Sequence, residues 1–236
     1  INVAQVVQKS SNVGAAKIAL SLAREDMWEL FNRAGFGAAP QLGFPGEAGG
    51  RLRPARTWRP VEQATMAYGH GISVSLMQLA RAYTMFARDG ELVPATLLKS
   101  DVPARGSRVI SAQTARQVRA MLELAVQPGG TAPRARIMGW RVAGKTGTAH
   151  KQEGGGYAPD KYISSFVGLA PASAPRLVIA VMIDEPSAGQ YYGGVVAAPV
   201  FAQVAQGALR LLGVPHDAPL EPVPLPGEGE EAREST

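Results

Sequence analysis

Hydrophobic residues recur at the spacing of a helix in three stretches before residue 128. The stretches cover residues 14–33, 73–90 and 111–126. Glycines follow the first stretch, Gly90 ends the second, and Pro128 follows the third. Glycine and proline are the residues that typically stop a helix. Residues 38–61 are rich in Gly, Pro and Arg and predict a long irregular connection.

The periodicity changes after Pro128. Residues 141–149, 162–170 and 176–184 are short and rich in β-branched and aromatic residues, so they predict three strands. The five residues PASAP between the last two fit an antiparallel hairpin. A final helical pattern covers residues 198–213. Helices precede the strands and a helix follows them, which predicts an α+β fold with an antiparallel sheet flanked by helices.

Residues 214–236 are rich in proline and acidic residues and poor in bulky side chains, which predicts a disordered tail after a folded portion at 1–213. The chain has a net charge of +5, and without the acidic tail its body carries +10. The arginines are scattered through loops without interleaved aromatics or a nucleic-acid-binding motif. We therefore expect a surface that attracts small anions and no nucleic-acid partner. Cysteine is absent, which excludes thiol catalysis, disulfides and zinc-thiolate sites.

The stretch GWRVAGKTGTAH, residues 139–150, matches two motifs at once. Read from Gly139 it is the G-x-x-x-x-G-K-T pattern of a P-loop, and read from Lys145 it is K-T-G-T. A P-loop needs a flexible turn that leads into a helix. Here the bulky run WRVA fills the variable positions and HKQEGGG follows, so nucleotide binding through residues 139–146 is a remote alternative.

A strand explains the same residues better. Side chains alternate along a strand, so Thr146 and Thr148 share one face while Lys145 and Gly147 lie on the other. Two hydroxyls at the rim of a cleft can bind a carboxylate, and the lysine adds positive charge. Gly147 would leave room for a ligand backbone to approach the strand. An ordinary strand with solvent-facing threonines is the alternative from this motif alone.

A second motif lies near the start of the chain. Ser10, Ser11 and Asn12 precede the first predicted helix and supply an S-x-N element. Serine and asparagine are also common helix N-caps, so this element alone is ambiguous. Together with K-T-G-T, it forms two of the three elements of serine β-lactamases and penicillin-binding proteins, the third being S-x-x-K.

With these motifs the sequence resembles the transpeptidase domain of class B penicillin-binding proteins, most closely the division-specific type. The stretches that carry the resemblance are KSSNVGAAKIAL, ATMAYGHGISVSLMQLARAYTMFARDG, KTGTA and YYGGVVAAPVF. The resemblance implies a transpeptidase fold like that of serine β-lactamases and an exported enzyme without cofactor or metal. Such an enzyme crosslinks peptidoglycan stem peptides. A serine attacks the D-Ala–D-Ala bond, releases D-alanine and forms an acyl-enzyme that a neighbouring amine resolves.

The resemblance also implies roles for single residues. Ser10 would relay a proton to the leaving amine, and Asn12 would donate to the backbone carbonyl of the substrate. Lys145 would lie opposite Ser10, tuning its proton affinity and adding positive field.

The remaining implied residues would bind the substrate. Thr146 and Thr148 would hold the terminal carboxylate beside Gly147, and the backbone N–H of Thr148 would be one oxyanion-hole donor. Tyr191 and Tyr192 would line the cleft near the end of the strand, although from the residues alone they are equally well explained as plain loop aromatics.

No serine in the chain has a lysine three positions later, so the nucleophile is missing. In the resembling family S-x-x-K precedes S-x-N, and it would lie upstream of Ile1 with the first strands of the sheet and a membrane anchor. We therefore expect this chain alone to be inactive. It is either the C-terminal piece of a full-length enzyme or a truncated, non-catalytic remnant acting as a binding or interaction module.

The resemblance finally implies a location and partners. The enzyme would lie on the periplasmic face of the inner membrane and act in septal cell-wall synthesis. Stem peptides ending in D-Ala–D-Ala, β-lactam antibiotics and division proteins would be its partners.

Overall fold

The computed structural model describes residues 1–102, 104–153 and 156–221 and divides into two compact units. Unit 1 comprises Ile1–Val6 and Ser11–Arg116, and unit 2 comprises Val7–Ser10 and Gln117–Thr236. Two helices continue from one unit into the other: α1 (Val3–Lys9) and α6 (Ala112–Ala125).

Unit 1 is helical, and its small two-stranded sheet is antiparallel. Its elements are α2 (Asn12–Leu20), α3 (Arg24–Arg33), η1 (Ala55–Thr57), α4 (Pro60–Met66), α5 (Leu76–Ala87), β1 (Glu91–Leu92) and β2 (Ser107–Arg108). Trp58 and Met66, each 2% exposed, pack with Met27 in one apolar cluster. A second cluster joins the end of α3 to α5 and β1. The predicted helix over 73–90 is confirmed as α5, where Ser75 accepts from the backbone N–H of Gln78 as N-cap.

The single helix predicted over residues 14–33 is wrong, because α2 and α3 are separate. The chain turns at residues 21–23, and Ala23 has an extended backbone at the start of α3. Buried Gln63 donates to the carbonyls of Ala19 (2.8 Å) and Leu22 (3.0 Å) at this break. A side chain more than 40 residues later thus adds hydrogen bonds to carbonyls at this break, which the local pattern does not show.

Helix α4 begins inside the region predicted as irregular, and Glu62 fixes its first turn. The Glu62 carboxylate accepts from the backbone N–H of Arg59 (2.8 Å) and from the Arg53 guanidinium (2.6 Å). These two contacts hold the pKa of the Glu62 carboxyl at about 2, below its ordinary value of 4.5. The charged form of Glu62 is therefore the one that stabilises unit 1.

We expect Glu62→Gln to lower the Tm of unit 1 at pH 7. Because the folded pKa lies below the unfolded value, the stabilisation is present above pH 4.5 and is lost as the pH falls toward 2. The difference in Tm between wild type and variant should therefore narrow over that interval, as measured by circular dichroism. Glu29→Gln, on the exposed surface of α3, is the control and should shift the Tm little. A difference that stays constant from pH 7 to pH 2 would contradict the assignment.

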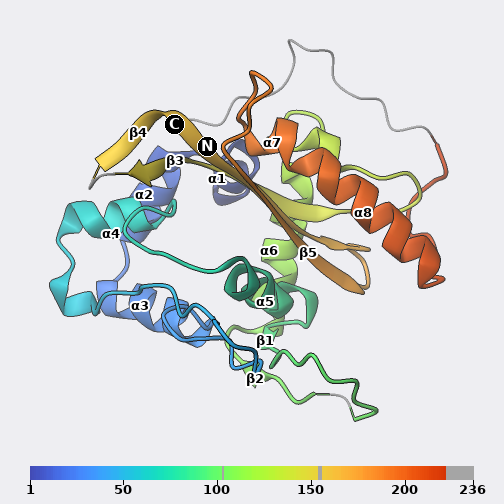
Figure 1. The fold of residues 1–236 in the computed structure, drawn as a ribbon, viewed down its shortest axis with the longest axis horizontal. Helices are drawn as coiled ribbons and strands as arrows, with labels where there is room; N and C mark the ends of the chain where they lie inside the picture. The colour runs from blue at the N-terminus through green and yellow to red at the C-terminus, as the bar shows by residue number, and fades with distance from the viewer. Residues whose placement is uncertain (103, 154–155, 222–236) are drawn as a thin grey trace. The chain divides into compact units, whose positions relative to one another are not determined.

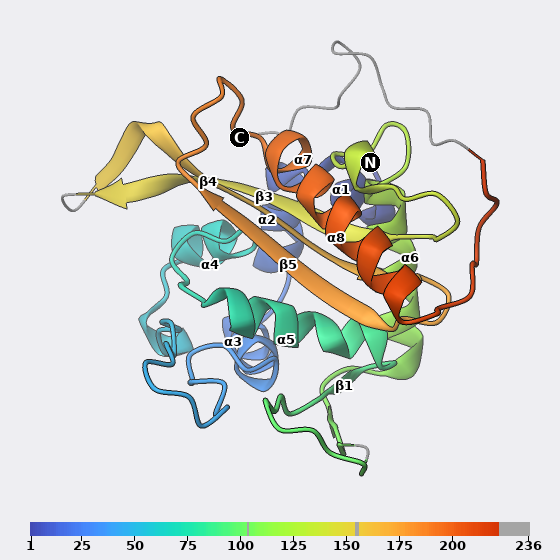
Figure 2. The same cartoon turned by 45° about the vertical axis from the view of Figure 1, so that its right-hand side comes forward.

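Unit 2 is built on a three-stranded antiparallel sheet in the order β3-β4-β5. Its elements are η2 (Pro133–Ala135), β3 (Ala143–Glu153), β4 (Gly156–Ala170), β5 (Leu177–Asp184), α7 (Gly193–Val196) and α8 (Ala198–Leu211). All three predicted strands and the β4–β5 hairpin are confirmed, and β3 and β4 extend further than predicted. Helix α8 packs along one side of the sheet against β4 and β5 (Figures 1 and 2). The α+β fold with helices flanking an antiparallel sheet is confirmed.

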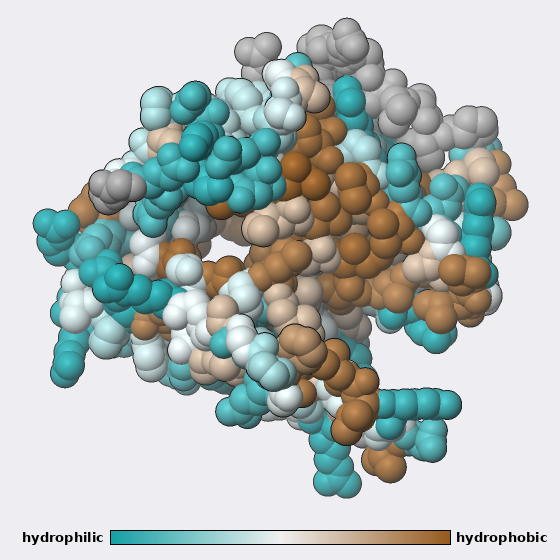
Figure 3. All heavy atoms as spheres, viewed as in Figure 1, coloured by the Kyte–Doolittle hydropathy of each residue, from teal (hydrophilic) through white to brown (hydrophobic). Residues whose placement is uncertain are grey.

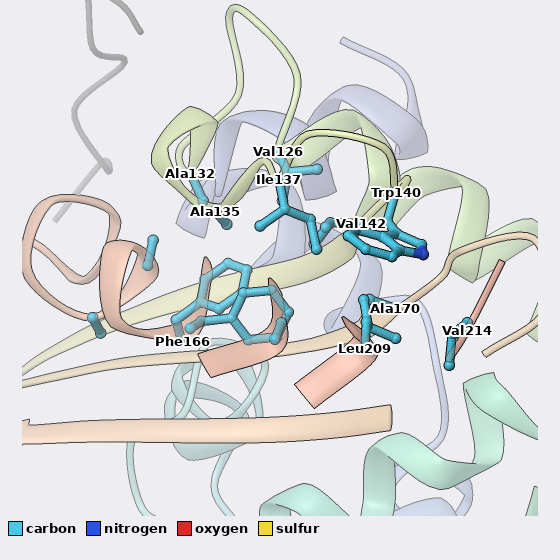
Figure 4. Packing of buried hydrophobic residues seen from close by; sticks show 14 residues of the cluster. Val126, Ala132, Ala135, Ile137, Trp140, Val142, Phe166, Ala170, Leu209 and Val214 are labelled. Atoms are coloured by element: carbon cyan, nitrogen blue, oxygen red, sulfur yellow. The ribbon is translucent and has the colours of Figure 1, made fainter. Parts of the chain in front are cut away.

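The core of unit 2 lies between α8 and the sheet. Phe166 of β4 and Phe201 of α8 are both fully buried and meet edge to face, with ring centroids 4.8 Å apart. Side chains from the segment between α6 and β3, such as Ile137 and Trp140, gather with Phe166 in the same cluster (Figure 4). A Cβ at Gly144 would lie 2.4 Å from the Phe166 ring, so the ring packs directly on the bare backbone of β3.

The outer side of α8 is apolar as well. Val200, Val204 and Leu211 recur at helical spacing and are 38%, 51% and 90% exposed, and Figure 3 shows this region as hydrophobic surface. By length and composition alone, Gly193–Leu211 would suffice to cross a membrane. Its other side, with Phe201, belongs to the core, so we describe it as a core helix of unit 2.

Residues just after α8 return to the sheet. Val214 is buried, and the Asp217 carboxylate accepts from the backbone N–H of Arg141 (2.7 Å) and from the Ser173 hydroxyl (2.6 Å). The indole of Trp140 donates to the Pro215 carbonyl (3.1 Å). Residues 214–220, which the sequence assigned to a disordered tail, are therefore part of unit 2. Of that predicted tail, Glu221 is still described, and residues 222–236 lie outside the described residues.

Candidate active site

The central contact of the site joins two residues that are 135 positions apart. Lys145 Nζ donates to Ser10 Oγ at 2.8 Å. Lys145 lies on β3, and Ser10 follows the last residue of α1. Ser10 has φ 55°, in the left-handed region that few residues other than glycine adopt. Such strained conformations are enriched at functional sites.

The structure separates the two possible roles of the S-S-N sequence. Ser11 is the N-cap of α2, and its hydroxyl accepts from the backbone N–H of Gly14 at 3.1 Å. The hydroxyl of Ser10 instead accepts a hydrogen bond from Lys145 Nζ. Asn12 is the first residue of α2 and belongs to unit 1, so its predicted role stays a prediction.

The K-T-G-T residues lie on a strand along their whole length. Thr146 faces Phe166 across the β3–β4 ladder, and Thr148 faces Ser164. No helix follows Lys145 in the described part of β3, which continues to Glu153. A P-loop needs a helix N-terminus at this point, so nucleotide binding through residues 139–146 has no structural support.

Both threonines accept hydrogen bonds within unit 2. Lys145 Nζ lies 3.0 Å from Thr146 Oγ1 and 3.3 Å from the Thr146 carbonyl. Thr131 Oγ1 lies 3.0 Å from Thr146 Oγ1, and the side chains of Thr131 and Thr146 are buried. Thr148 Oγ1 accepts from the backbone N–H of Gly193 at 3.0 Å. The site therefore holds a lysine ammonium and two oriented hydroxyls on one strand.

Two glycines let α7 approach this strand. A Cβ at Gly193 would lie 2.4 Å from the Ser165 carbonyl oxygen, and one at Gly194 would lie 2.1 Å from the Thr131 carbonyl oxygen. Any other residue at either position would push α7 away from Thr131 and Thr148. Gly193 and Gly194 lie in the stretch YYGGVVAAPVF that carries the resemblance, but the sequence assigned them no role. Thr131 was not marked at all, and the glycine pair before it, Gly129 and Gly130, was the signal that could have found it.

Gly147 is needed for packing between strands, whatever its predicted role. A Cβ at Gly147 would lie 2.5 Å from Ser165 Oγ, on the neighbouring strand. The glycine thus accommodates a cross-strand side chain, and the predicted approach of a ligand backbone at this point stays a prediction.

Tyr191 and Tyr192 belong to an ordered aromatic stack. The rings of Tyr162 and Tyr191 are 3.9 Å apart at an interplanar angle of 10°, and Tyr191 contacts Tyr192 at 4.5 Å. His150 of β3 extends the stack on the other side of Tyr162, at 4.5 Å. Burial, followed by the neighbouring Tyr191, raises the pKa of Tyr162. The fully buried Ser164 holds the Tyr191 backbone by a hydrogen bond to its carbonyl, so the stack has a fixed position on β4.

A second lysine on β3 differs from Lys145 in its partners. Lys151 Nζ contacts the carboxylates of Asp184 (2.9 Å) and Glu185 (2.6 Å), and these hydrogen bonds raise its pKa. The oxygens that Lys145 contacts at Ser10 and Thr146 carry no formal charge. The described contacts of Lys145 thus place its ammonium among the hydroxyls of Ser10 and Thr146. Among residues 1–102, 104–153 and 156–221, no cluster of three His, Asp or Glu side chains could hold a metal ion.

Comparisons with known proteins agree on one family. The family profile described as "Penicillin binding protein transpeptidase domain" matches residues 1–206. The curated relatives include a probable peptidoglycan D,D-transpeptidase PenA of Neisseria meningitidis, 46% identical over 93% of this chain and 38% of its own length. Peptidoglycan D,D-transpeptidase FtsI of Escherichia coli is 41% identical over 90% of this chain and 36% of its own length.

Solved structures show the same fold. The apo transpeptidase domain of penicillin-binding protein 3 from Burkholderia pseudomallei is 54% identical, with a TM-score of 0.89, covering 93% of this chain and 67% of that chain. Penicillin-binding protein 3 from Mycobacterium tuberculosis, complexed with aztreonam, is 32% identical, with a TM-score of 0.84, covering 95% of this chain and 54% of that chain. The chain thus spans well under half the length of the curated relatives named above. It belongs to the transpeptidase domain family of class B penicillin-binding proteins.

Proposed function

We propose that this chain is the C-terminal part of the transpeptidase domain of a septal peptidoglycan D,D-transpeptidase. The longer protein would crosslink stem peptides through a serine acyl-enzyme, and we call it the parent enzyme. One observation carries the proposal: Lys145 Nζ lies 2.8 Å from Ser10 Oγ, beside the hydroxyls of a K-T-G-T strand. Ser10 also adopts a left-handed backbone conformation, of a kind that is enriched at functional sites.

The proposed chemistry is acyl transfer, with proton movement through Ser10. The S-x-x-K serine of the parent enzyme would attack the D-Ala–D-Ala carbonyl, and the bond to the terminal D-alanine would break. The attacking serine gives up its hydroxyl proton, and the leaving amine takes one up. Ser10 Oγ would relay this proton, donating its own to the amine and regaining one from the side of the nucleophile, with Lys145 setting the proton affinity of that hydroxyl. Asn12 would donate to the substrate backbone. The N–H of Thr148 would stabilise the oxyanion, an effect worth about 3–4 kcal/mol per donor in other acyl-transfer enzymes.

The proposed substrates follow from the charges and hydroxyls of the strand. A stem peptide ends in a carboxylate, which Thr146 and Thr148 would bind by donating hydrogen bonds beside the Lys145 ammonium. A β-lactam antibiotic also carries a carboxylate next to its reactive carbonyl, so it would occupy the same site. The aromatic stack at Tyr191 and Tyr192 would line the cleft.

The parent enzyme would act at the periplasmic face of the inner membrane with other division proteins as partners. The relative named peptidoglycan D,D-transpeptidase FtsI and the 54% identity to the Burkholderia transpeptidase domain support the transpeptidase part of this proposal. A non-catalytic binding or interaction module is the second candidate, because no S-x-x-K is present in the 236 residues. A membrane span followed by S-x-x-K in the same reading frame upstream of Ile1 would favour the enzyme.

We expect no covalent adduct when the 236-residue chain is incubated with penicillin and its intact mass is measured. The residue that would be acylated is absent from the sequence. The parent enzyme, treated in the same way, should gain the mass of one penicillin molecule. An adduct on the 236-residue chain would show that the nucleophile was wrongly assigned, and an unlabelled parent enzyme would refute the proposed function.

A further inference from the structure

The loop after α6 presents Thr131 to the site from within the core of unit 2. The loop folds back on the end of its own helix, because the backbone N–H of Ala132 donates to the Ala125 carbonyl at 2.9 Å. A Cβ at Gly130 would lie 2.3 Å from that carbonyl oxygen, so only glycine allows this turn. Thr131 itself is 6% exposed, and Gly194 of α7 covers its carbonyl. Its side chain therefore has one well-defined position.

The hydrogen atoms at Thr146 decide whether this residue can bind a carboxylate. A threonine hydroxyl has one hydrogen to donate and two lone pairs that accept. Lys145 Nζ, at 3.0 Å, can only donate, so it occupies one lone pair of Thr146 Oγ1. The bond between Thr131 and Thr146 can run in either direction, because each partner is a hydroxyl. If Thr146 donates to Thr131, its hydrogen is unavailable to a ligand.

The neighbouring threonine shows which direction the site needs. Thr148 Oγ1 accepts from the backbone N–H of Gly193, so the hydrogen of Thr148 can be donated to a ligand. A carboxylate is an acceptor only, and two matching donors on one strand bind it best. The same arrangement results at Thr146 when Thr131 is the donor. Both hydroxyl oxygens then accept from protein groups, and both hydrogens are presented to the ligand.

We propose that Thr131 is a positioning residue, whose hydroxyl donates to Thr146 Oγ1 and thereby turns the Thr146 hydrogen toward the carboxylate of the substrate. This inference rests on the proposed function, because it concerns the same carboxylate. Thr131 does not touch the reacting atoms. It acts through Thr146 and lowers the cost of ordering that hydroxyl when the ligand binds.

The test compares Thr131→Val with wild type in the parent enzyme, since valine has nearly the shape of threonine without the hydroxyl. The measurement is the second-order rate constant of acylation by a penicillin and by the carboxamide of the same penicillin. We expect Thr131→Val to slow acylation by the carboxylate form by about three- to tenfold, the effect of losing one neutral hydrogen bond that orders the Thr146 hydroxyl. The rate with the carboxamide should change much less, because that ligand can itself accept or donate.

The ratio of the two rate constants is independent of how much of the variant is correctly folded, since both ligands use the same molecules. Thr131→Ser retains the hydroxyl and should restore most of the preference for the carboxylate form. The inference would be overturned if penicillin acylated Thr131→Val as fast as wild type or faster, and if the ratio of the carboxylate to the carboxamide rate constant stayed the same or rose. That result would show that Thr146 donates to Thr131. A wild-type parent enzyme that neither penicillin nor its carboxamide acylates would instead refute the proposed function.

Discussion

Lys145→Ala is expected to slow the acylation of the parent enzyme by penicillin by roughly 10²–10⁴-fold, the usual range for a general acid–base group. The substitution removes the donor that lies 2.8 Å from Ser10 Oγ and 3.0 Å from Thr146 Oγ1. Ser10 would lose the group that sets its proton affinity, and the carboxylate would lose the nearby positive charge. The rate constant is measured with a fluorescent penicillin in stopped flow.

Lys151→Ala is the matched control for this experiment. Lys151 lies on the same strand, but its ammonium contacts Asp184 and Glu185 rather than the K-T-G-T hydroxyls. The Lys151→Ala variant should be acylated at the wild-type rate, although it loses the ion pair between Lys151 on β3 and Asp184 on β5. An equal loss in both variants would mean that general destabilisation of β3 explains the effect. Normal acylation of the Lys145 variant would exclude a role for this lysine.

Phe166→Ala is expected to destabilise unit 2 by about 3–5 kcal/mol, the range for removing a buried aromatic side chain. Phe166 is fully buried, packs edge to face on Phe201, and lies on the bare backbone of Gly144. The cavity cannot be filled from the β3 side, because Gly144 has no side chain that could move into it. Thr146 faces Phe166 in the strand register, so the site should lose order as well.

Urea unfolding of the 236-residue chain, followed by ¹⁹F NMR of fluorinated tryptophan, measures this effect. The chain has three tryptophans, and Trp140 is the one in unit 2, so its resonance reports on that unit alone. Tyr157→Ala, on the same strand but 51% exposed, is the control and should change the unfolding free energy little. A loss below about 1 kcal/mol in the Phe166 variant would contradict the packing described for this core.

The sequence predicted the parts of the fold that a local pattern controls. The strand carrying Lys145, the helix capped by Ser75 and the hairpin at residues 171–175 each follow from the periodicity and turn residues of a few neighbours. The K-T-G-T and S-x-N elements were also visible, because their spacing within a few residues is itself the signal. Their meeting at Lys145 and Ser10 was predicted through the resemblance alone.

The rest depended on contacts between distant segments. Gln63 supports the break after Leu22, and Thr131 contacts Thr146, yet neither residue stands out in its own stretch. The S-x-N spacing singled out Ser10, but the sequence did not show which residue caps the following helix, because serine and asparagine are both good N-caps. Only the backbone geometry shows that Ser11 caps α2 and that Ser10 turns toward β3. Such assignments need the positions of both partners, which periodicity does not give.

Asp217 sets a practical limit for shortening this chain at its C-terminus. A version that stops before Asp217 would lose the hydrogen bond from the backbone N–H of Arg141 to the Asp217 carboxylate. Arg141 lies just before β3, so the start of the strand that carries Lys145 would lose this support. A version that stops after residue 221 keeps every contact described above. Expression and crystallisation trials of the transpeptidase domain should therefore place their stop codon beyond Leu220 rather than at the end of α8.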